Sequence, residues 1–100
     1  MKKNAILFSK VDREDLWVTN GIVFEVQNTN TYVDAFNEIK DKLDNPEIFY
    51  PILERIKLET EDDTFKLNQI YWNYGLHFVF TNEFDEEYDY KMSADFVFIP

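Results

Sequence analysis

Residues 70–80 read IYWNYGLHFVF, and their side chains alternate with a period of two. The even positions are all large and apolar, whereas the odd positions include Asn73, Gly75 and His77. Such alternation is typical of a β-strand that buries one face and leaves the other in contact with water. We therefore predict one half-buried strand over residues 70–80.

The same pattern returns at the end of the chain. Even positions between residues 88 and 99 are apolar, and the odd positions there include Asp89, Lys91, Ser93 and Asp95. A polar connection, residues 81–87, joins this run to the first one. The two runs predict a long antiparallel hairpin whose acidic tip is displayed to water.

The front of the chain predicts a second hairpin. Residues 16–19 and 22–26 are rich in β-forming side chains, and they flank Asn20 and Gly21, a pair that favours a type I′ turn. Residues 5–11 predict a further strand, followed by the charged loop 12–15.

The middle of the chain has helical periodicity. Apolar residues recur at steps of four, three and four, at Tyr32, Phe36, Ile39 and Leu43. Thr31 is suited to cap the first turn, with Asp34 three residues later. Asn45 and Pro46 are expected to end this helix, and Pro51 is expected to open a second, shorter one.

Phe65 and Leu67 look like another strand, but their odd parity conflicts with the even parity from Ile70 onward. This conflict predicts a bulge or a break at Asn68 and Gln69. Together the patterns predict a single α+β domain over residues 1–100. Its antiparallel sheet has about five strands in the order β-β-β-α-α-β-β, with two helices packed on one face.

Charge is the most informative feature for function. The chain has 20 acidic and 10 basic residues, a formal net charge of −10, one His and no Cys. Two runs concentrate the acids, and aromatic residues accompany the second run. We predict that these runs contact a partner: Glu59, Glu61, Asp62 and Asp63, then Glu83, Phe84, Asp85, Glu86, Glu87, Tyr88, Asp89 and Tyr90.

Catalytic and metal-binding motifs are not found in the sequence. His77 is the only imidazole and shares its predicted strand face with Tyr71 and Asn73, so we expect a solvated or hydrogen-bonded histidine. Gly21 and Gly75 stand alone, so no phosphate-binding loop is present. Neither acidic run has the glycine of a calcium loop, and zinc lacks its usual ligands. We expect no enzymatic activity, no catalytic residue, no metal and no cofactor.

The balance of charge also argues against two classes of partner. A net charge of −10 repels the phosphate backbone, so we expect no direct binding of nucleic acid. The apolar stretch near the start, residues 5–8, is too short for a signal peptide or a membrane span. A chain without cysteine also fits a reducing compartment, and we expect a cytoplasmic protein that is a monomer or a homodimer.

Carboxylates beside aromatic rings suit a protein that enters a cationic groove on a basic protein partner. In size, charge and composition the chain is similar to the small acidic immunity proteins that neutralise bacterial nuclease toxins. It is also similar to phage-encoded nucleic-acid mimics such as anti-CRISPR inhibitors. Either resemblance implies one-to-one binding with inhibition by occlusion, and neither carries over a functional residue.

Other interpretations stay open on the sequence alone. An acidic hairpin tip also protects sheet edges from aggregation, which is a purely structural role. A second candidate contact is the helix face that bears Asp34, Glu38 and Asp41. A third interpretation is an assembly protein that dimerises through its sheet, because apolar residues fall on the face expected to be wet: Tyr71, Val79, Val97 and Ile99.

Overall fold

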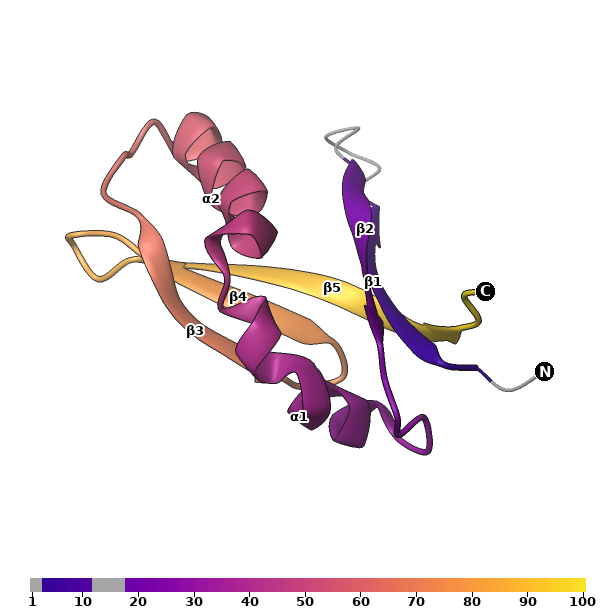
Figure 1. The fold of residues 1–100 in the computed structure, drawn as a ribbon. Coiled ribbons are helices and arrows are strands. Elements are labelled where there is room, and N and C mark those ends of the chain that lie inside the picture. Colours follow the sequence, from indigo (N-terminus) through magenta and orange to yellow (C-terminus); the bar gives the residue numbers. More distant parts are fainter. Residues whose placement is uncertain (1–2, 12–17) are drawn as a thin grey trace.

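The computed structural model describes residues 3–11 and 18–100, and the side chains of residues 3–10 and 21–100. Its five strands form one antiparallel sheet in the order β2-β1-β5-β4-β3. The elements are β1 (Ala5–Val11), β2 (Val18–Glu25), α1 (Tyr32–Leu43), α2 (Pro46–Thr60), β3 (Lys66–Trp72), β4 (Leu76–Thr81) and β5 (Glu87–Val97). The sheet curls, and both helices lie in the angle between β1–β2 and β3–β4–β5 (Figure 1). The predicted α+β class is confirmed.

The order of the elements differs from the prediction, because two strands precede the helices and three follow them. Asn20 and Gly21 do not form a turn but lie inside β2. The register between β1 and β2 shifts between Phe8 and Lys10, so that Asn20 and Gly21 together face Ser9. This two-against-one arrangement is a β-bulge, which also favours glycine. The predicted loop 12–15 and residues 16–17 lie outside the described residues.

The predicted single strand over residues 70–80 is in fact the end of β3, a turn and β4. The turn places Tyr74 in the left-handed region with φ 52°. Trp72 and Leu76 pair directly across it and therefore point to the same face of the sheet. The even parity thus continues through the reversal, which explains why the alternation concealed the turn.

The helix caps follow the sequence closely, with one exception. The Thr31 hydroxyl accepts a hydrogen bond from the Asp34 backbone N–H at 3.1 Å, as predicted. The second helix begins at Pro46 and not at Pro51, because the Asn45 side chain caps it by accepting from the backbone N–H of Glu47. Proline at the first helical position loses no intrahelical bond, and the helix continues past Pro51.

Two predictions on the second half of the sheet are confirmed. The register of β3 against β4 shifts between Leu67 and Gln69, so the bulge at Asn68 is present. β4 and β5 form the long hairpin, with Thr81 and Glu87 as its last pair before the acidic tip.

The core lies between the helices and the concave face of the sheet. Even positions of β4 and β5 enter it together with one face of each helix. Its largest fully buried side chains are Tyr90, Phe8, Phe78, Phe80, Ile6, Ile39, Leu43, Ile52, Ile56, Leu76 and Met92. One cluster therefore packs both helices against strands from both halves of the chain.

Candidate functional site

The two acidic runs, far apart in sequence, meet at one end of the sheet. The link is Asn82, whose side-chain amide donates to Asp62 Oδ2 at 3.0 Å and to Glu86 Oε1 at 2.9 Å. The Thr64 hydroxyl adds a second link by accepting from the backbone N–H of Glu83 at 3.1 Å. Tyr88 donates from its hydroxyl to Glu59 Oε2 at 3.4 Å and forms a third.

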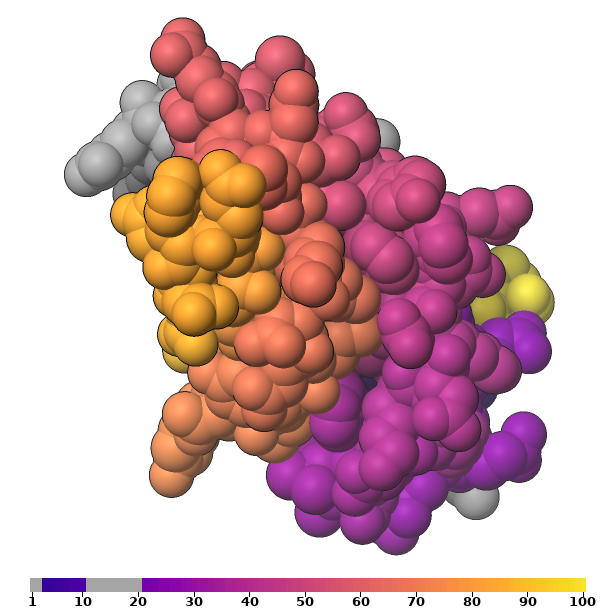
Figure 2. All heavy atoms as spheres, turned by 90° about the vertical axis from the view of Figure 1, so that its left-hand side faces the viewer, coloured from indigo at the N-terminus to yellow at the C-terminus, as the bar shows by residue number. Residues whose placement is uncertain are grey.

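We call this surface the acidic edge. It comprises the carboxylates of the β4–β5 tip and those at the end of α2, namely Glu59, Glu61, Asp62, Asp63, Glu83, Asp85, Glu86 and Glu87. Figure 2 shows the tip and the segment that follows α2 side by side in one continuous surface. Two loops that looked independent in the sequence thus form a single anionic surface.

Asn82 also builds the tip itself. Its Oδ1 accepts hydrogen bonds from the backbone N–H groups of Phe84 and Glu86, at 3.0 and 2.9 Å. The residue is only 5% exposed, although every residue from Glu83 to Glu87 is exposed. A buried amide that satisfies both donors and acceptors holds a loop in one conformation. The sequence analysis missed this residue. Its signal in the sequence was its place immediately after a strand, where an Asn side chain can hydrogen-bond to the backbone of a turn.

Phe84 projects from this ordered tip. Its side chain is 71% exposed although it is large and apolar. Asp85 follows in the left-handed region with φ 60°, a conformation that Asp tolerates better than most residues. The tip therefore presents an aromatic ring surrounded by carboxylates, on a backbone that is already organised.

A basic residue pairs with the acidic edge at the end of α2. Arg55 lies one turn before Glu59 in α2, and its Nε is 3.1 Å from Glu59 Oε1. This pair is partly exposed and contributes little to stability. It involves one of the eight carboxylates that the acidic edge brings together.

Thr64 holds the pKa of the Asp62 carboxyl below its usual value of 3.8, through hydrogen bonds from its hydroxyl and its backbone N–H. The Asn82 amide adds a further donor. A depressed carboxyl pKa stabilises the fold above the unfolded-state value, and that contribution is lost as the pH falls through the folded-state value.

We expect the T64V substitution, which removes the hydroxyl donor, to raise the pKa of Asp62 toward 3.8. The T64S substitution should leave the pKa low, because serine keeps the hydroxyl. A carboxyl-carbon NMR titration between about pH 2 and 6 measures both variants, centred on the usual range for Asp. An unchanged Asp62 midpoint in T64V would contradict the assignment.

Two predicted contact residues lie away from the acidic edge. Tyr90 has no exposed surface, so it belongs to the core and cannot touch a partner in this fold. The alternation of residues 88–99 already placed Tyr90 on the apolar face. Asp89 points the other way, to the face of the sheet turned away from the helices, which we call the open face.

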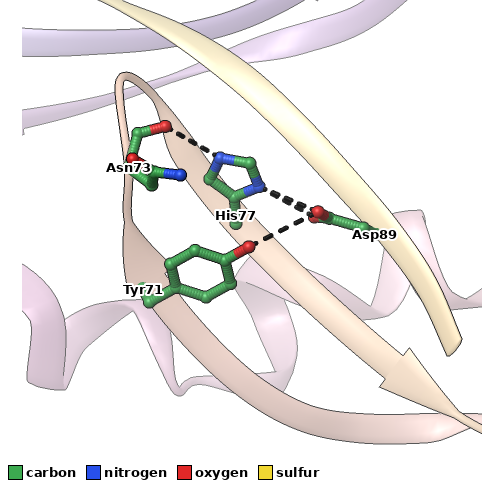
Figure 3. Close-up of polar contacts among 4 residues, drawn as sticks. All are labelled: Tyr71, Asn73, His77 and Asp89. Carbon is green, nitrogen blue, oxygen red and sulfur yellow. Dashed lines mark hydrogen bonds and ion pairs between the residues drawn. The ribbon is translucent and has the colours of Figure 1, made fainter.

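On the open face Asp89 belongs to a polar cluster around His77 (Figure 3). His77 Nδ1 lies 2.9 and 3.1 Å from the two Asp89 carboxylate oxygens, and Nε2 lies 3.0 Å from the Asn73 backbone oxygen. The Tyr71 ring stacks on the imidazole at 4.5 Å. His77 is therefore hydrogen-bonded, as expected, but at 7% exposed it is not solvated.

This geometry limits what His77 can do chemically. Both ring nitrogens face acceptors, and a neutral imidazole donates only one hydrogen bond. Both bonds form together only when the ring is doubly protonated. Nε2 points at a backbone oxygen and Nδ1 at the Asp89 carboxylate in this arrangement.

Tyr71 shares the same cluster. Partial burial and the neighbouring Asp89 carboxylate raise the pKa of its phenol above 10. The hydroxyl lies 3.5 Å from Asp89 Oδ2, at the limit of a hydrogen bond. The phenol therefore stays neutral at physiological pH, and it closes one side of the His77 cluster.

The open face is less apolar than the assembly interpretation expected. Val79 is only 6% exposed, so it offers almost no surface. Tyr71, Val97 and Ile99 are half-buried. Within residues 3–11 and 18–100, no three side chains of His, Cys, Asp or Glu are grouped as a metal site would need. Over the same residues, no helix has both the length and the apolar character required to cross a membrane.

Comparisons with known proteins leave the chain without an assigned relative. No family model matches it, and no curated protein or solved structure matches it.

Proposed function

We propose that this chain is a small inhibitory binding protein, without catalytic activity, whose acidic edge occupies a basic surface of a protein partner. A nuclease-type bacterial toxin is the partner that we favour, which makes the chain a cytoplasmic immunity protein. The proposal rests on one observation: Asn82 joins two distant acidic runs into one ordered surface with an exposed Phe84 at its tip.

Charge and order support this mode of binding together. Clustered carboxylates attract a cationic partner over several ångströms and accelerate the encounter. An exposed ring inside such a cluster provides the desolvated anchor that interfaces use for affinity. Because the tip is organised by hydrogen bonds before binding, little conformational entropy is lost on association.

The test neutralises the tip without disturbing its hydrogen bonds. The variant carries E83Q, D85N, E86Q and E87Q, since amides keep the shape and the acceptor that Asn82 needs. A matched control carries four amide substitutions at exposed carboxylates outside the acidic edge, namely E25Q, D41N, E47Q and E54Q. Both variants reach the same net charge, so only the position of the charge differs.

Proteins captured from a native lysate at low salt by the wild-type chain supply the partner, and stopped-flow mixing then gives association rates. We expect the tip variant to associate at least tenfold more slowly, with a weaker dependence on salt, while the control stays within about threefold of wild type. Equal rates for the two variants would show that the acidic edge is not the contact.

Nucleic acid provides a second readout on the captured complex. If the chain occupies a nuclease cleft, a short DNA duplex should compete with it, because both ligands need the same cationic surface. A phage-type nucleic-acid mimic gives the same competition but captures a nucleic-acid-binding defence protein instead. Capture of a partner that DNA does not displace would contradict occlusion of such a cleft.

A further inference from the structure

The second half of β5 has a strand partner on one side only. β4 pairs with β5 no further than Met92, whereas β1 pairs with it from Ser93 to Val97. Figure 1 shows β5 continuing past the end of β4 toward β1. On the side where β4 would continue, no strand among residues 3–11 and 18–100 pairs with residues 93–97. The backbone N–H and C=O groups of residues 93–97 that point to that side therefore have no strand partner in the described part of the chain, although β5 is a central strand. We call them the open edge of β5.

The β3–β4 turn prevents β4 from covering this edge. Gly75 adopts φ 157°, and a Cβ there would lie 2.9 Å from the backbone oxygen of Met92. The backbone N–H of Asn73 donates to the Gly75 oxygen at 2.9 Å and closes the turn. The turn therefore packs closely against β5 and leaves the following residues of β5 uncovered by β4.

A groove of about 410 Å³ runs beside the open edge. It is mostly apolar, and its walls include three aromatic residues, Tyr32, Trp72 and Tyr74, together with Val33, Ser93 and Ala94. Tyr32 stacks on Phe96 at 4.5 Å and on Trp72 at 5.8 Å. Tyr74 is 91% exposed in a left-handed conformation that is unfavourable for a bulky residue. Strained and exposed aromatic residues of this kind are concentrated at binding sites.

We propose that residues 93–97 are a docking site for an extended segment of another protein, which adds to β5 as a further strand. Main-chain hydrogen bonds to the open edge would provide affinity, and the aromatic groove would provide a pocket for alternate side chains. This surface is separate from the acidic edge, and the inference does not depend on the proposed function.

The side chains of β5 define the chemistry of that segment. Ala94 and Phe96 have the parity of the concave face, where small Ala94 leaves room in the aromatic groove. Asp95 has the opposite parity and is exposed. A strand added here places one set of side chains into an apolar groove and the other set beside a carboxylate. The preferred segment therefore alternates apolar and basic residues.

A second copy of the chain is a poor occupant of the same edge. Two copies pairing antiparallel over residues 93–97 would place Asp95 directly opposite its equivalent. Like charges directly opposite each other destabilise a strand pair, and each copy also has a net charge of −10. The open edge is thus better suited to a basic segment than to self-association.

The test uses a display library of random seven-residue peptides. Peptides that bind are enriched separately on the immobilised wild-type chain and on the immobilised D95K variant. A matched control, E47K, makes the same charge change at an exposed site in α2. We expect wild type and E47K to enrich peptides that alternate apolar and basic residues, and D95K to bind those peptides at least tenfold more weakly. Failure to enrich such peptides, or equal binding by D95K and E47K, would overturn the proposal.

Amide hydrogen exchange followed by NMR tests the backbone part of the proposal. In the free protein we expect protection to alternate along residues 93–97, with slow exchange only for amides that face β1. The selected peptide should slow the remaining amides of this segment. Uniform protection in the free protein, or a homodimer that protects the same amides, would show that the edge is already covered or is used by a second copy.

Discussion

Replacing Phe78 with alanine is expected to lower the free energy of unfolding by about 3–5 kcal/mol, the usual cost of removing a fully buried phenylalanine. Phe78 has no exposed surface, and β4 holds it between Ile70 on β3 and Tyr90 on β5. The neighbouring ring of Phe80 stacks 6.4 Å away. Loss of the ring would leave a cavity between the sheet and the helices. The free energy of unfolding of a natural domain is roughly 5–15 kcal/mol, so the F78A variant should be close to unfolding.

Urea denaturation followed by circular dichroism measures this effect, and L58A is the matched control. Leu58 is equally apolar but 73% exposed, so its truncation should cost less than about 0.5 kcal/mol. A loss below about 1 kcal/mol for F78A would mean that the core relaxes into the space, contrary to dense packing around β4.

The second large effect is expected at Asn82. The N82A substitution removes four side-chain hydrogen bonds, to the Asp62 and Glu86 carboxylates and to the backbone N–H groups of Phe84 and Glu86. Part of the lost hydrogen-bond free energy is recovered, because the Asp62 and Glu86 carboxylates are at the surface and can bind water instead. We expect a net destabilisation of about 2 kcal/mol, since each bond contributes roughly 0.5–1.5 kcal/mol before that recovery.

We expect N82A to affect the order of the tip more than the stability of the fold. Backbone relaxation measured by NMR reports this order. In N82A, residues 83–87 should become mobile on the nanosecond timescale, because the two loops of the acidic edge are no longer joined. N28A is a suitable control, since the Asn28 side chain accepts only one local hydrogen bond, from Asn30, in an exposed loop. A tip that stays as ordered in N82A as in N28A would show that Asn82 does not organise the acidic edge.

Much of the fold follows from short-range patterns in the chain. The Thr31 cap, the end of α1 and the β4–β5 hairpin each depend on residues a few positions apart, and each was predicted. Even the bulge at Asn68 was visible, because a change of parity requires an extra residue on one strand. These features depend on backbone geometry that neighbouring side chains control.

Each error arose where a local sequence pattern fits two structures and other contacts select one of them. The turn at Tyr74 was missed because both sides of a hairpin keep the same parity when the residues next to the turn pair with each other. Asn20 and Gly21 are suited equally to a tight turn and to a bulge, and strand pairing selects the bulge. Pro51 is tolerated inside α2 because Asn45 and Pro46 begin the helix earlier.

The same distinction applies to the candidate site. Both acidic runs were identified from composition, but their union through Asn82 was not, because it depends on where the β4–β5 tip falls relative to the end of α2. Tyr90 was included in the predicted contact although its parity indicated burial. It was included because acidic residues precede it in the sequence. Its side chain is buried because it points to the core face of β5.

Charge, alternation and capping are properties of neighbouring residues, so the α+β class, the two ends of α1 and the acidic character of the chain could be deduced without coordinates. The acidic edge, the His77 cluster and the open edge of β5 all arise from pairing between segments distant in sequence. That pairing is selected by the burial of one shared core, a sum over many side chains that no local pattern contains. Only the folded arrangement therefore reveals which carboxylates act together and which backbone groups are left without a strand partner.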